Sequence, residues 1–376
     1  MLTRFYLDNY RCFTNTEIPL SRANLLLGRN GAGKSTFMDA IFAVVNMIVQ
    51  GSPVSEAFPG TSRTVWDSRT DQKIEFDLAG KDGRYTYRLQ LHHDTERDEV
   101  VIFREAVDID SKHLYRFENG LVSLFDNDGT MGVQFPVKCA QSFLSQLQIR
   151  PENTLLISFV DYLRGIWLIK LDPTNISSDS RSESESLDPD GANFASWYRH
   201  FSQERGDTSE LFGNISLALP GFRRMRAVSI GKGGQTRELM VEFEFGRDNG
   251  SYEVDFEDLS DGERATIVLY CLLADSEHNA SADESFRTLL LDEPENYVGL
   301  QLIQSWLADL SEALSDRGQL FVASHHPEVI DYLAADHTLF FERLDGGPAR
   351  VKENPFDRDI GISASEAIRK GLLDGE

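Results

Sequence analysis

The spacing of apolar and polar residues divides the chain into regions of different secondary structure. Residues 3–9 are predicted to form a first strand, and residues 17–27 lead into a second one. The second ends in the apolar run 24–27, which is typical of a buried parallel strand. Beyond a glycine-rich segment, apolar residues recur at helical spacing, at Phe37, Ile41, Phe42, Val45 and Ile48. The pattern therefore predicts a strand, a loop and a helix in succession.

A different pattern, of short runs with alternating apolar and polar residues, extends from about residue 64 to residue 138. Such alternation is typical of strands that are buried on one face only. Three dipeptides that favour hairpin turns lie between these runs, namely Asp82-Gly83, Asn119-Gly120 and Asp128-Gly129. We therefore expect an antiparallel β-region inserted after the first helix.

The second half of the chain returns to alternating helical and strand-like segments. A polar, acidic and serine-rich stretch at 177–186 has low complexity, and we expect a mobile loop over 173–192. The other expected elements are a helix followed by a strand within 139–171, helices over 192–219, strands at about 226–230 and 238–245, and an α/β segment from 260 onward.

Composition excludes several classes of protein. The chain of 376 residues is 41% hydrophobic, which suffices for a sizeable core, and it holds no apolar run long enough to span a membrane. Its first residues lack the apolar stretch of a signal peptide, so a cytoplasmic protein is expected. Cys12, Cys139 and Cys271 lack the spacing of metal ligands, and we expect them to be buried apolar residues.

The charge of the chain bears on nucleic acid as a partner. The formal net charge of −24 argues against a protein whose whole surface binds nucleic acid. A local basic stripe is present, formed by Arg223, Arg224, Arg226, Lys232 and Arg237. These residues either line a groove for DNA or are ordinary charges that flank a strand, and the second interpretation is favoured. DNA is therefore a weakly supported partner.

Residues 28–35 read Gly-Arg-Asn-Gly-Ala-Gly-Lys-Ser, which is a complete G-x-x-x-x-G-K-[ST] phosphate loop. Its glycines let backbone amides point at a phosphate, its lysine reaches the β- and γ-phosphates, and its serine hydroxyl ligates Mg²⁺. Because a strand and a helix flank it, a chance glycine-rich turn is the less favoured alternative. The residues expected to bind ATP are Gly28, Arg29, Asn30, Gly31, Ala32, Gly33, Lys34, Ser35 and Thr36, with Ser35 also on the metal.

An apolar run at 288–291 ends in two acids, Asp292 and Glu293, which is the pattern of a Walker B strand. A parallel strand delivers such carboxylates to the edge of the sheet where ligands bind. We expect Asp292 to hold Mg²⁺ and Glu293 to act as the general base toward the attacking water. This motif is weak alone, and the phosphate loop makes it strong evidence for an ATP site.

The segment Leu259-Ser260-Asp261-Gly262-Glu263 precedes a helical run. Taken alone it is a capping box, with Ser260 as the N-cap and Glu263 at the third position. It also resembles the Leu-Ser-Gly-Gly-Gln signature of ATP-binding cassette (ABC) ATPases, although Asp261 and Glu263 replace a Gly and the Gln. In that family the signature contacts the γ-phosphate of an ATP held by a second subunit. The resemblance implies this role for Ser260, Asp261, Gly262 and Glu263.

A further strand, at 319–323, ends in Ser324-His325-His326. In ABC ATPases a histidine at this place senses the γ-phosphate, and His325 aligns with it. The resemblance therefore implies that Lys34, Glu293 and His325 are the catalytic residues. A histidine with only a structural role is the alternative, which is favoured for His326.

The order of phosphate loop, signature, Walker B strand and histidine is the order found in ABC ATPases. The opening of the chain resembles the SMC, RecF and OLD-type branch, in which an arginine placed like Arg11 reaches the nucleotide phosphates. Asp292-Glu293-Pro294-Glu295 resembles the motif of small RecF-like ATPases that are often described as AAA family. The resemblance covers essentially the whole chain.

This resemblance implies an α/β fold, in which a single ABC-type ATPase head has a parallel phosphate-loop sheet, an antiparallel β insertion and a helical lobe. The expected parts are residues 1–140 with the phosphate loop and the β insertion, 141–275 with the helical signature lobe, and 276–376 with the Walker B strand and His325.

The chain departs from the family pattern in several places. No long coiled coil lies between Lys34 and Ser260, so the head lacks the arms of SMC proteins. Tyr297-Val298-Gly299 replaces a segment that resembles Leu-His-Pro in relatives. The glutamine that completes the Mg²⁺ site in relatives is not obvious: Gln141 is the candidate, and a plain surface glutamine is an equal alternative. No nuclease motif follows the head, so we expect another chain to supply any effector action.

The function implied by the resemblance is an ATP-dependent dimerisation switch with slow hydrolysis. Two subunits would enclose two ATP molecules with Mg²⁺ across a two-fold interface, and a higher oligomer is left open. The output would be DNA repair or anti-phage defence, carried out through a separate effector chain and without a membrane partner. The alternatives are a nucleotide-binding subunit of an ABC transporter and a scaffold that binds nucleotide without hydrolysing it.

Overall fold

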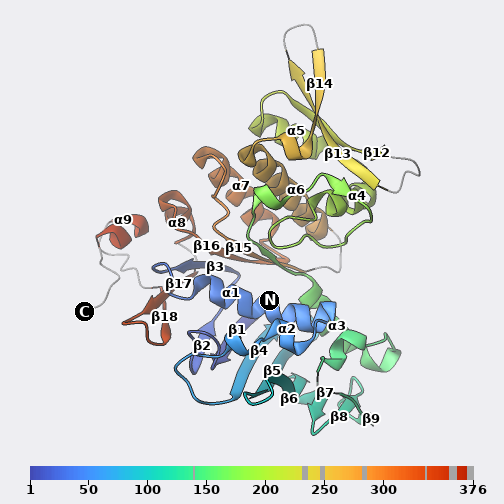
Figure 1. Ribbon diagram of the computed structural model, residues 1–376, viewed down its shortest axis with the longest axis vertical. Coiled ribbons are helices and arrows are strands. Elements are labelled where there is room, and N and C mark those ends of the chain that lie inside the picture. The colour runs from blue at the N-terminus through green and yellow to red at the C-terminus, as the bar shows by residue number, and fades with distance from the viewer. Residues whose placement is uncertain are drawn as a thin grey trace. The chain divides into compact units, whose positions relative to one another are not determined.

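The computed structural model describes residues 1–138, 140–230, 236–245, 250–281, 286–334, 337–354 and 362–370. The chain divides into two compact units, one made of residues 1–166 and 333–376 and the other of residues 167–332 (Figure 1). The limits of these units do not coincide with the boundaries expected at residues 140 and 275. Among the described residues, none of the helices is long and apolar enough to cross a bilayer.

The first unit is built on an eight-stranded antiparallel sheet. Its strands are β1 (Leu2–Asp8), β2 (Thr16–Pro19), β4 (Asp71–Ala79), β5 (Arg84–Asp94), β6 (Glu99–Ile109), β7 (Lys112–Glu118), β8 (Leu121–Phe125) and β9 (Met131–Pro136). They lie in the order β2-β1-β4-β5-β6-β7-β8-β9, so the N-terminal strand joins the inserted β-region in one sheet. The three predicted hairpin dipeptides connect β4 to β5, β7 to β8 and β8 to β9. The predicted antiparallel insertion is confirmed.

A smaller group of strands in the same unit carries the phosphate loop. Strand β3 (Ala23–Leu27) pairs in parallel with β17 (His337–Arg343), which pairs antiparallel with β18 (Ala349–Glu353). The loop follows β3 and leads into helix α1 (Lys34–Val45), which continues as a π-helical segment, η1 (Asn46–Gln50). The predicted succession of strand, loop and helix is confirmed.

Buried aromatic rings fix α1 on two sides. Phe37 of α1 meets Phe5 of β1 edge to face, with ring centroids 5.6 Å apart, and contacts Phe341 of β17 at 5.9 Å. Phe5 also stacks on Phe76 of β4 at 5.8 Å. All four rings are buried, and burial of each contributes about 1.5–3 kcal/mol. The helix that begins at the phosphate loop is therefore held firmly against both groups of strands.

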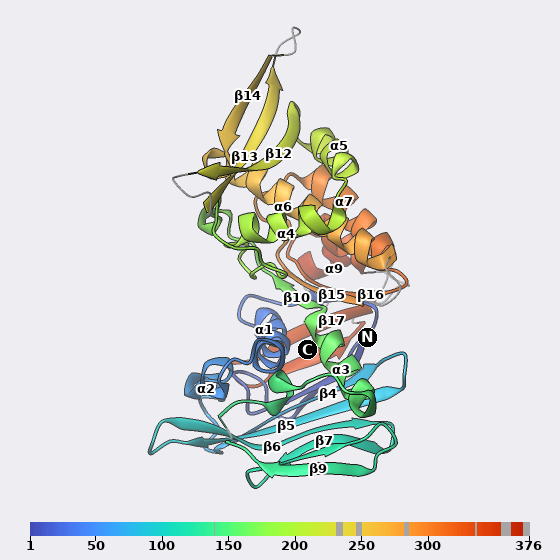
Figure 2. The same cartoon turned by 90° about the vertical axis from the view of Figure 1, so that its right-hand side faces the viewer.

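The remaining helices of the first unit are α2 (Val54–Ala57), α3 (Thr154–Arg164) and α9 (Ala364–Arg369), with 3₁₀ turns at Gly60–Ser62, Phe143–Gln146 and Pro151–Asn153. Figure 2 shows α1, α2 and α3 on one face of the eight-stranded sheet. The helix expected from residue 139 onward begins only at residue 154. Pro151 explains the late start, because proline lacks a backbone N–H and disfavours helical conformation in the residue before it.

A buried histidine of this unit gives the protein a predictable dependence on pH. His93 of β5 is buried, with its Nε2 3.2 Å from Oε1 of Gln72 on β4. Burial, with the nearby charge of Arg63, lowers the pKa of His93 from the ordinary 6.5 to about 4. In the unfolded chain the imidazole of His93 becomes protonated below pH 6.5, whereas in the folded protein it stays neutral until about pH 4. Because protonation favours the unfolded chain between these values, the stability of the fold falls as the pH falls from 6.5 toward 4.

The wild-type protein should lose unfolding free energy between about pH 7 and pH 5, and His93→Gln should lose about 1–2 kcal/mol less. Urea denaturation at each pH measures both values. His92→Gln is the control, because this neighbouring side chain on β5 is exposed. A His93→Gln variant that loses as much stability on acidification as the wild type would refute the assignment.

The second unit contains the Walker B strand. Strand β15 (Arg287–Asp292) pairs in parallel with β16 (Gly318–Ala323), residue Asp292 opposite Ala323, and its other neighbour is β10 (Ile166–Ile169). The helices are α4 (Phe194–Arg205), α5 (Ser209–Ala218), α6 (Asp261–Ser281), α7 (Leu300–Ala313) and α8 (Pro327–Leu333), with 3₁₀ turns at Pro173–Asn175 and Phe256–Asp258. Because β15 and β16 are parallel and in register, the residues that follow them emerge at one edge.

A second sheet of this unit lies beside α4 and α5 (Figure 1). Its strands are β11 (Asp179–Ser180), β12 (Phe222–Ile230), β13 (Thr236–Phe245) and β14 (Gly250–Asp255), and β13 pairs antiparallel with the other three. The stretch expected as a mobile loop supplies β11, and Arg199 donates a hydrogen bond of 2.9 Å to the Ser180 hydroxyl. This polar stretch thus has defined partners from distant parts of the chain, which its composition did not indicate.

Candidate functional site

The loop between β3 and α1 has a backbone that requires glycine. Gly28 and Gly33 have φ angles of 143° and 118°, which other residues rarely adopt. A Cβ atom at Gly28 would lie 2.2 Å from the carbonyl oxygen of Phe341 in β17, so a side chain is also excluded sterically. The loop is therefore fixed against β17 in a conformation that leaves Asn30 and Gly31 exposed.

The start of α1 is suited to an anion. The first turn of this helix has no acidic residue, so no carboxylate neutralises the positive end of the helix dipole. The Lys34 side chain is buried and donates hydrogen bonds to the carbonyl oxygens of Gly28, at 2.7 Å, and Arg29, at 3.4 Å. Ser35 and Thr36 follow in the same turn, half-buried. The amides, the ammonium and two hydroxyls can together hold phosphate oxygens and a metal.

A pocket of about 430 Å³ lies beside the phosphate loop within the first unit. One wall is formed by residues 29–32 of the loop, and the other by residues 340–344 with Gly346. Its volume lies within the range of about 300–1,000 Å³ that is typical of small-molecule sites. The pocket therefore offers space for part of a ligand whose phosphates are held by the loop.

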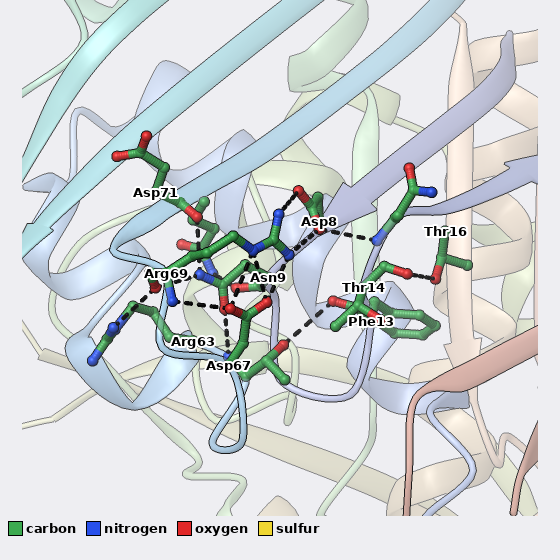
Figure 3. A network of polar contacts seen from close by, with 12 residues as sticks. Asp8, Asn9, Phe13, Thr14, Thr16, Arg63, Asp67, Arg69 and Asp71 are labelled. Atoms are coloured by element: carbon green, nitrogen blue, oxygen red, sulfur yellow. Dashed lines mark hydrogen bonds and ion pairs between the residues drawn. The ribbon is translucent and has the colours of Figure 1, made fainter.

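Arg11 lies close to the helix that begins at the phosphate loop. Its guanidinium forms an ion pair of 2.7 Å with Asp39 of α1, and its side chain is 47% exposed, so the group can exchange partners. Figure 3 shows the network that anchors the preceding residues: Arg69 binds both oxygens of Asp8 at 2.8 Å, and the Asn9 amide donates to the carbonyl oxygens of Arg69 and Asp71. This anchoring positions Arg11 beside α1, and its predicted contact with nucleotide phosphates stays a prediction.

In the second unit, β15 ends in the two predicted acids. The Asp292 side chain is 7% exposed, and its Oδ2 lies 3.2 Å from the ammonium of Lys170. Glu293 begins the turn after the strand with a φ of 53°, held there by a hydrogen bond from its N–H to the carbonyl of Ala323. Its carboxylate accepts a hydrogen bond of 3.0 Å from the Asn296 amide. The glutamate is thus presented at the strand end by its backbone and by Asn296.

The segment after β16 brings a histidine to this glutamate. His325 is 44% exposed on its side chain, and its Nε2 lies 3.9 Å from Oε1 of Glu293. Glu295 links the two turns, because its carboxylate accepts hydrogen bonds from the Ser324 hydroxyl, at 2.6 Å, and the His325 amide, at 3.2 Å. His326 instead accepts a hydrogen bond on Nδ1 from the Glu328 amide, which is a structural role at the start of α8. The structure thus places Glu293 and His325 together.

The signature segment forms the capping box that its sequence predicts. The Glu263 carboxylate accepts hydrogen bonds from the Ser260 amide and hydroxyl, at 2.9 and 2.7 Å. Ser260 is exposed at the start of α6, and Asp261 forms an ion pair with Arg264. A Cβ atom at Gly262 would lie 3.0 Å from the carbonyl oxygen of Tyr297, so the signature contacts the turn that follows Glu293.

One predicted site residue lies elsewhere. The Gln141 amide donates a hydrogen bond of 3.0 Å to the carbonyl of Gly51, the residue that ends η1. The phosphate loop is at the opposite end of this helix, about 25 Å away at 1.5 Å per residue. The predicted role of Gln141 in the Mg²⁺ site is therefore corrected: its contact with Gly51 fits the alternative of a surface glutamine.

Two residues that sequence reasoning did not assign to the site are close to the Walker B acids. Lys170 contacts Asp292, and Glu295 links the turns after β15 and β16. The only sequence signal for Lys170 was its place directly after an apolar strand. Cys12 and Cys271 are buried as expected, burial raises the pKa of both thiols, and Cys139 lies outside the described residues. In the described part of the chain, no cluster of histidine, cysteine and acidic residues forms a metal site by itself.

Three arginines of the basic stripe are paired with glutamates of neighbouring strands. On β12, Arg223 and Arg224 bind Glu242 at 3.1 and 2.6 Å, and Arg226 binds both oxygens of Glu253 at 2.6 Å. Lys232 lies outside the described residues. The three arginines therefore fit the interpretation of ordinary charges flanking a strand, and they offer little net charge to a DNA backbone.

Comparisons with known proteins identify a family and similar folds. A family model described as "AAA domain, putative AbiEii toxin, Type IV TA system" matches residues 23–331. Among solved structures, "SmcHead bound to the C-winged helix domain of ScpA" is 16% identical with a TM-score of 0.58, covering 97% of this chain and 99% of that one. An SMC head domain from Thermotoga maritima is 15% identical with a TM-score of 0.44, covering 93% and 98%. No curated protein matches the sequence.

The family match spans most of the chain, and the structural likeness concerns the fold alone. The chain therefore belongs to this family of AAA-type ATPase domains, and it has the fold of an SMC head.

Proposed function

We propose that the protein binds ATP with Mg²⁺, hydrolyses the ATP slowly, and uses the nucleotide as a dimerisation switch. The observation that carries this proposal is the approach of Glu293 and His325 at the end of the Walker B strand, in a chain that also holds a complete phosphate loop. A carboxylate oriented beside a histidine after a parallel strand is the arrangement needed to position a water against a γ-phosphate.

The proposed roles follow from the chemistry of each group. Lys34, Arg11 and the loop amides would hold the phosphates. The oxygen donors that would hold Mg²⁺ are the Ser35 hydroxyl and the Asp292 carboxylate. Oxygen donors of this kind are the ligands that Mg²⁺ prefers, and bound Mg²⁺ neutralises charge on the β- and γ-phosphates. Glu293 orients the attacking water, and His325 donates a hydrogen bond toward the γ-phosphate.

For the dimer, we propose that Ser260 and Gly262 at the start of α6 contact the γ-phosphate bound by a partner subunit. The support is that Ser260 is exposed at the start of a long helix, where backbone N–H groups without intrahelical partners can bind an anion. The Ser260 hydroxyl donates a hydrogen bond to Glu263, and the acidic residues Asp261 and Glu263 occupy the first turn of the helix. A partner's γ-phosphate would therefore have to replace Glu263 at the Ser260 hydroxyl.

The test is the solution mass of Glu293→Gln by light scattering, with and without ATP and Mg²⁺. We expect ATP to double the mass, because blocked hydrolysis retains the γ-phosphate that bridges the subunits, and we expect Ser260→Arg to abolish this change. Ser305→Arg is the matched control, since Ser305 is an exposed helical serine on α7. A mass that does not respond to ATP would remove the switch from consideration.

For the biological output, we propose anti-phage defence through a separate effector chain. The support is the description of the matched family, which names a toxin of a toxin–antitoxin system. A direct role in DNA repair is less supported, because the arginines of β12 are paired with glutamates. Phage plating on host cells that carry the wild type or Glu293→Gln tests the output, and equal plating would argue against defence.

A further inference from the structure

Lys170 and Asp292 form an ion pair in which the two partners differ in exposure. The Lys170 Nζ lies 3.2 Å from Oδ2 of Asp292, and the side chains are 60% and 7% exposed. The Lys170 backbone is fixed, because it follows β10, the neighbour of β15, and its N–H donates to the carbonyl of Pro189 at 2.7 Å. The Asp292 carboxylate and the backbone of Lys170 are therefore held in place, while the Lys170 ammonium reaches solvent.

In this arrangement the Lys170 ammonium pairs with the Asp292 carboxylate, which the proposed function assigns to Mg²⁺. Mg²⁺ binds carboxylate oxygen at about 2.0–2.1 Å. An ammonium 3.2 Å from Oδ2 repels a divalent ion at the same oxygen, and the repulsion is only partly screened because Asp292 is buried. The flexible stem of lysine allows the ammonium to withdraw, but the withdrawal gives up an ion pair.

We propose that Lys170 is a counter-ion that keeps Asp292 closed to free Mg²⁺ until a nucleotide delivers the metal. This inference rests on the proposed function, because it takes Asp292 as the Mg²⁺ ligand. Phosphate oxygens supply further ligands and negative charge, which together outweigh the loss of the Lys170–Asp292 pair. The lysine therefore couples metal binding to nucleotide binding and acts as a positioning residue for the metal site.

The experiment measures the affinity of Mn²⁺, used alone as the probe, for the nucleotide-free protein by electron paramagnetic resonance. We expect Lys170→Met to bind Mn²⁺ about fivefold to tenfold more tightly than the wild type, in line with the modest energy of a partly exposed pair. Lys170→Arg should behave as the wild type because it keeps the charge. Lys352→Met is the matched control, since Lys352 pairs with the largely buried Glu342 at 3.0 Å.

A double variant, Lys170→Met with Asp292→Asn, should lose the whole gain in affinity. Equal Mn²⁺ affinity in Lys170→Met and the wild type would overturn the inference, and so would a gain that persists in the double variant. The same titration with ATP separates this failure from that of the proposed function. If ATP promotes Mn²⁺ binding through Asp292 and the Lys170→Met gain is absent, the inference alone fails. If ATP promotes no binding that depends on Asp292, both fail.

Discussion

Replacing Glu293 by Gln is expected to lower the rate of ATP hydrolysis by about 10²–10⁴-fold while ATP–Mg²⁺ binding is retained. The amide cannot accept a proton from the attacking water, which is the role proposed for the carboxylate. The change is nearly isosteric, and a glutamine oxygen can still accept the hydrogen bond from Asn296. The turn after β15, set by the Glu293 backbone contact to Ala323, should therefore be unchanged.

Phosphate release measures the rate, and equilibrium titration with a fluorescent ATP analogue measures the binding. Glu312→Gln is the control, because Glu312 is an exposed glutamate on α7, away from the Walker B turn. Hydrolysis that survives Glu293→Gln within a few-fold would show that another group activates the water. Loss of binding together with hydrolysis would indicate that Glu293 acts on the metal or on the fold instead.

The largest effect on stability is expected at Trp306. This residue of α7 is fully buried, and its Nε1 donates a hydrogen bond of 2.8 Å to the carbonyl of Leu269 in α6. We expect Trp306→Ala to lower the unfolding free energy of the second unit by about 3–5 kcal/mol, because it removes a large buried side chain and leaves a cavity. Since α6 begins at the signature segment, the variant should also lose ATP-dependent dimerisation near its lowered melting temperature.

A second variant separates the hydrogen bond from the volume of the side chain. Trp306→Phe keeps an aromatic ring but no donor, and we expect a smaller loss of about 1–3 kcal/mol. Urea denaturation followed by circular dichroism measures both variants. Trp306→Ala within about 1 kcal/mol of the wild type would mean that α6 and α7 do not depend on this contact.

The local elements were largely predictable from the sequence. Glycine-containing dipeptides located three hairpin turns of the β insertion, and helical spacing located α1 after the phosphate loop, because turn and helix preferences act over a few residues. The predicted start of a helix at residue 139 was wrong, because apolar content alone does not reveal where a proline interrupts the helical hydrogen-bond pattern. Strand β14 was also missed, since none of its residues is buried and they show little apolar pattern.

The candidate site was predictable to a similar degree. The residues of the phosphate loop, Asp292, Glu293 and His325 carry motifs that depend on chemistry at fixed spacing, and such motifs can be read from the chain. The position of Gln141 could not, because a lone glutamine has no pattern around it. The arginines of β12 looked like a basic stripe in the sequence, and their glutamate partners lie on β13 and β14.

The sequence by itself therefore determined the family, the phosphate loop, the Walker B acids and the order of the motifs. Only the tertiary structure decided which charges are paired: Lys170 with Asp292, Glu295 with the segment of His325, and Arg11 with Asp39. The physical reason is one of range. Backbone preferences and motif spacing act between near neighbours in the chain, whereas ion pairs depend on distance in space, which is set by the pairing of strands that are far apart in sequence.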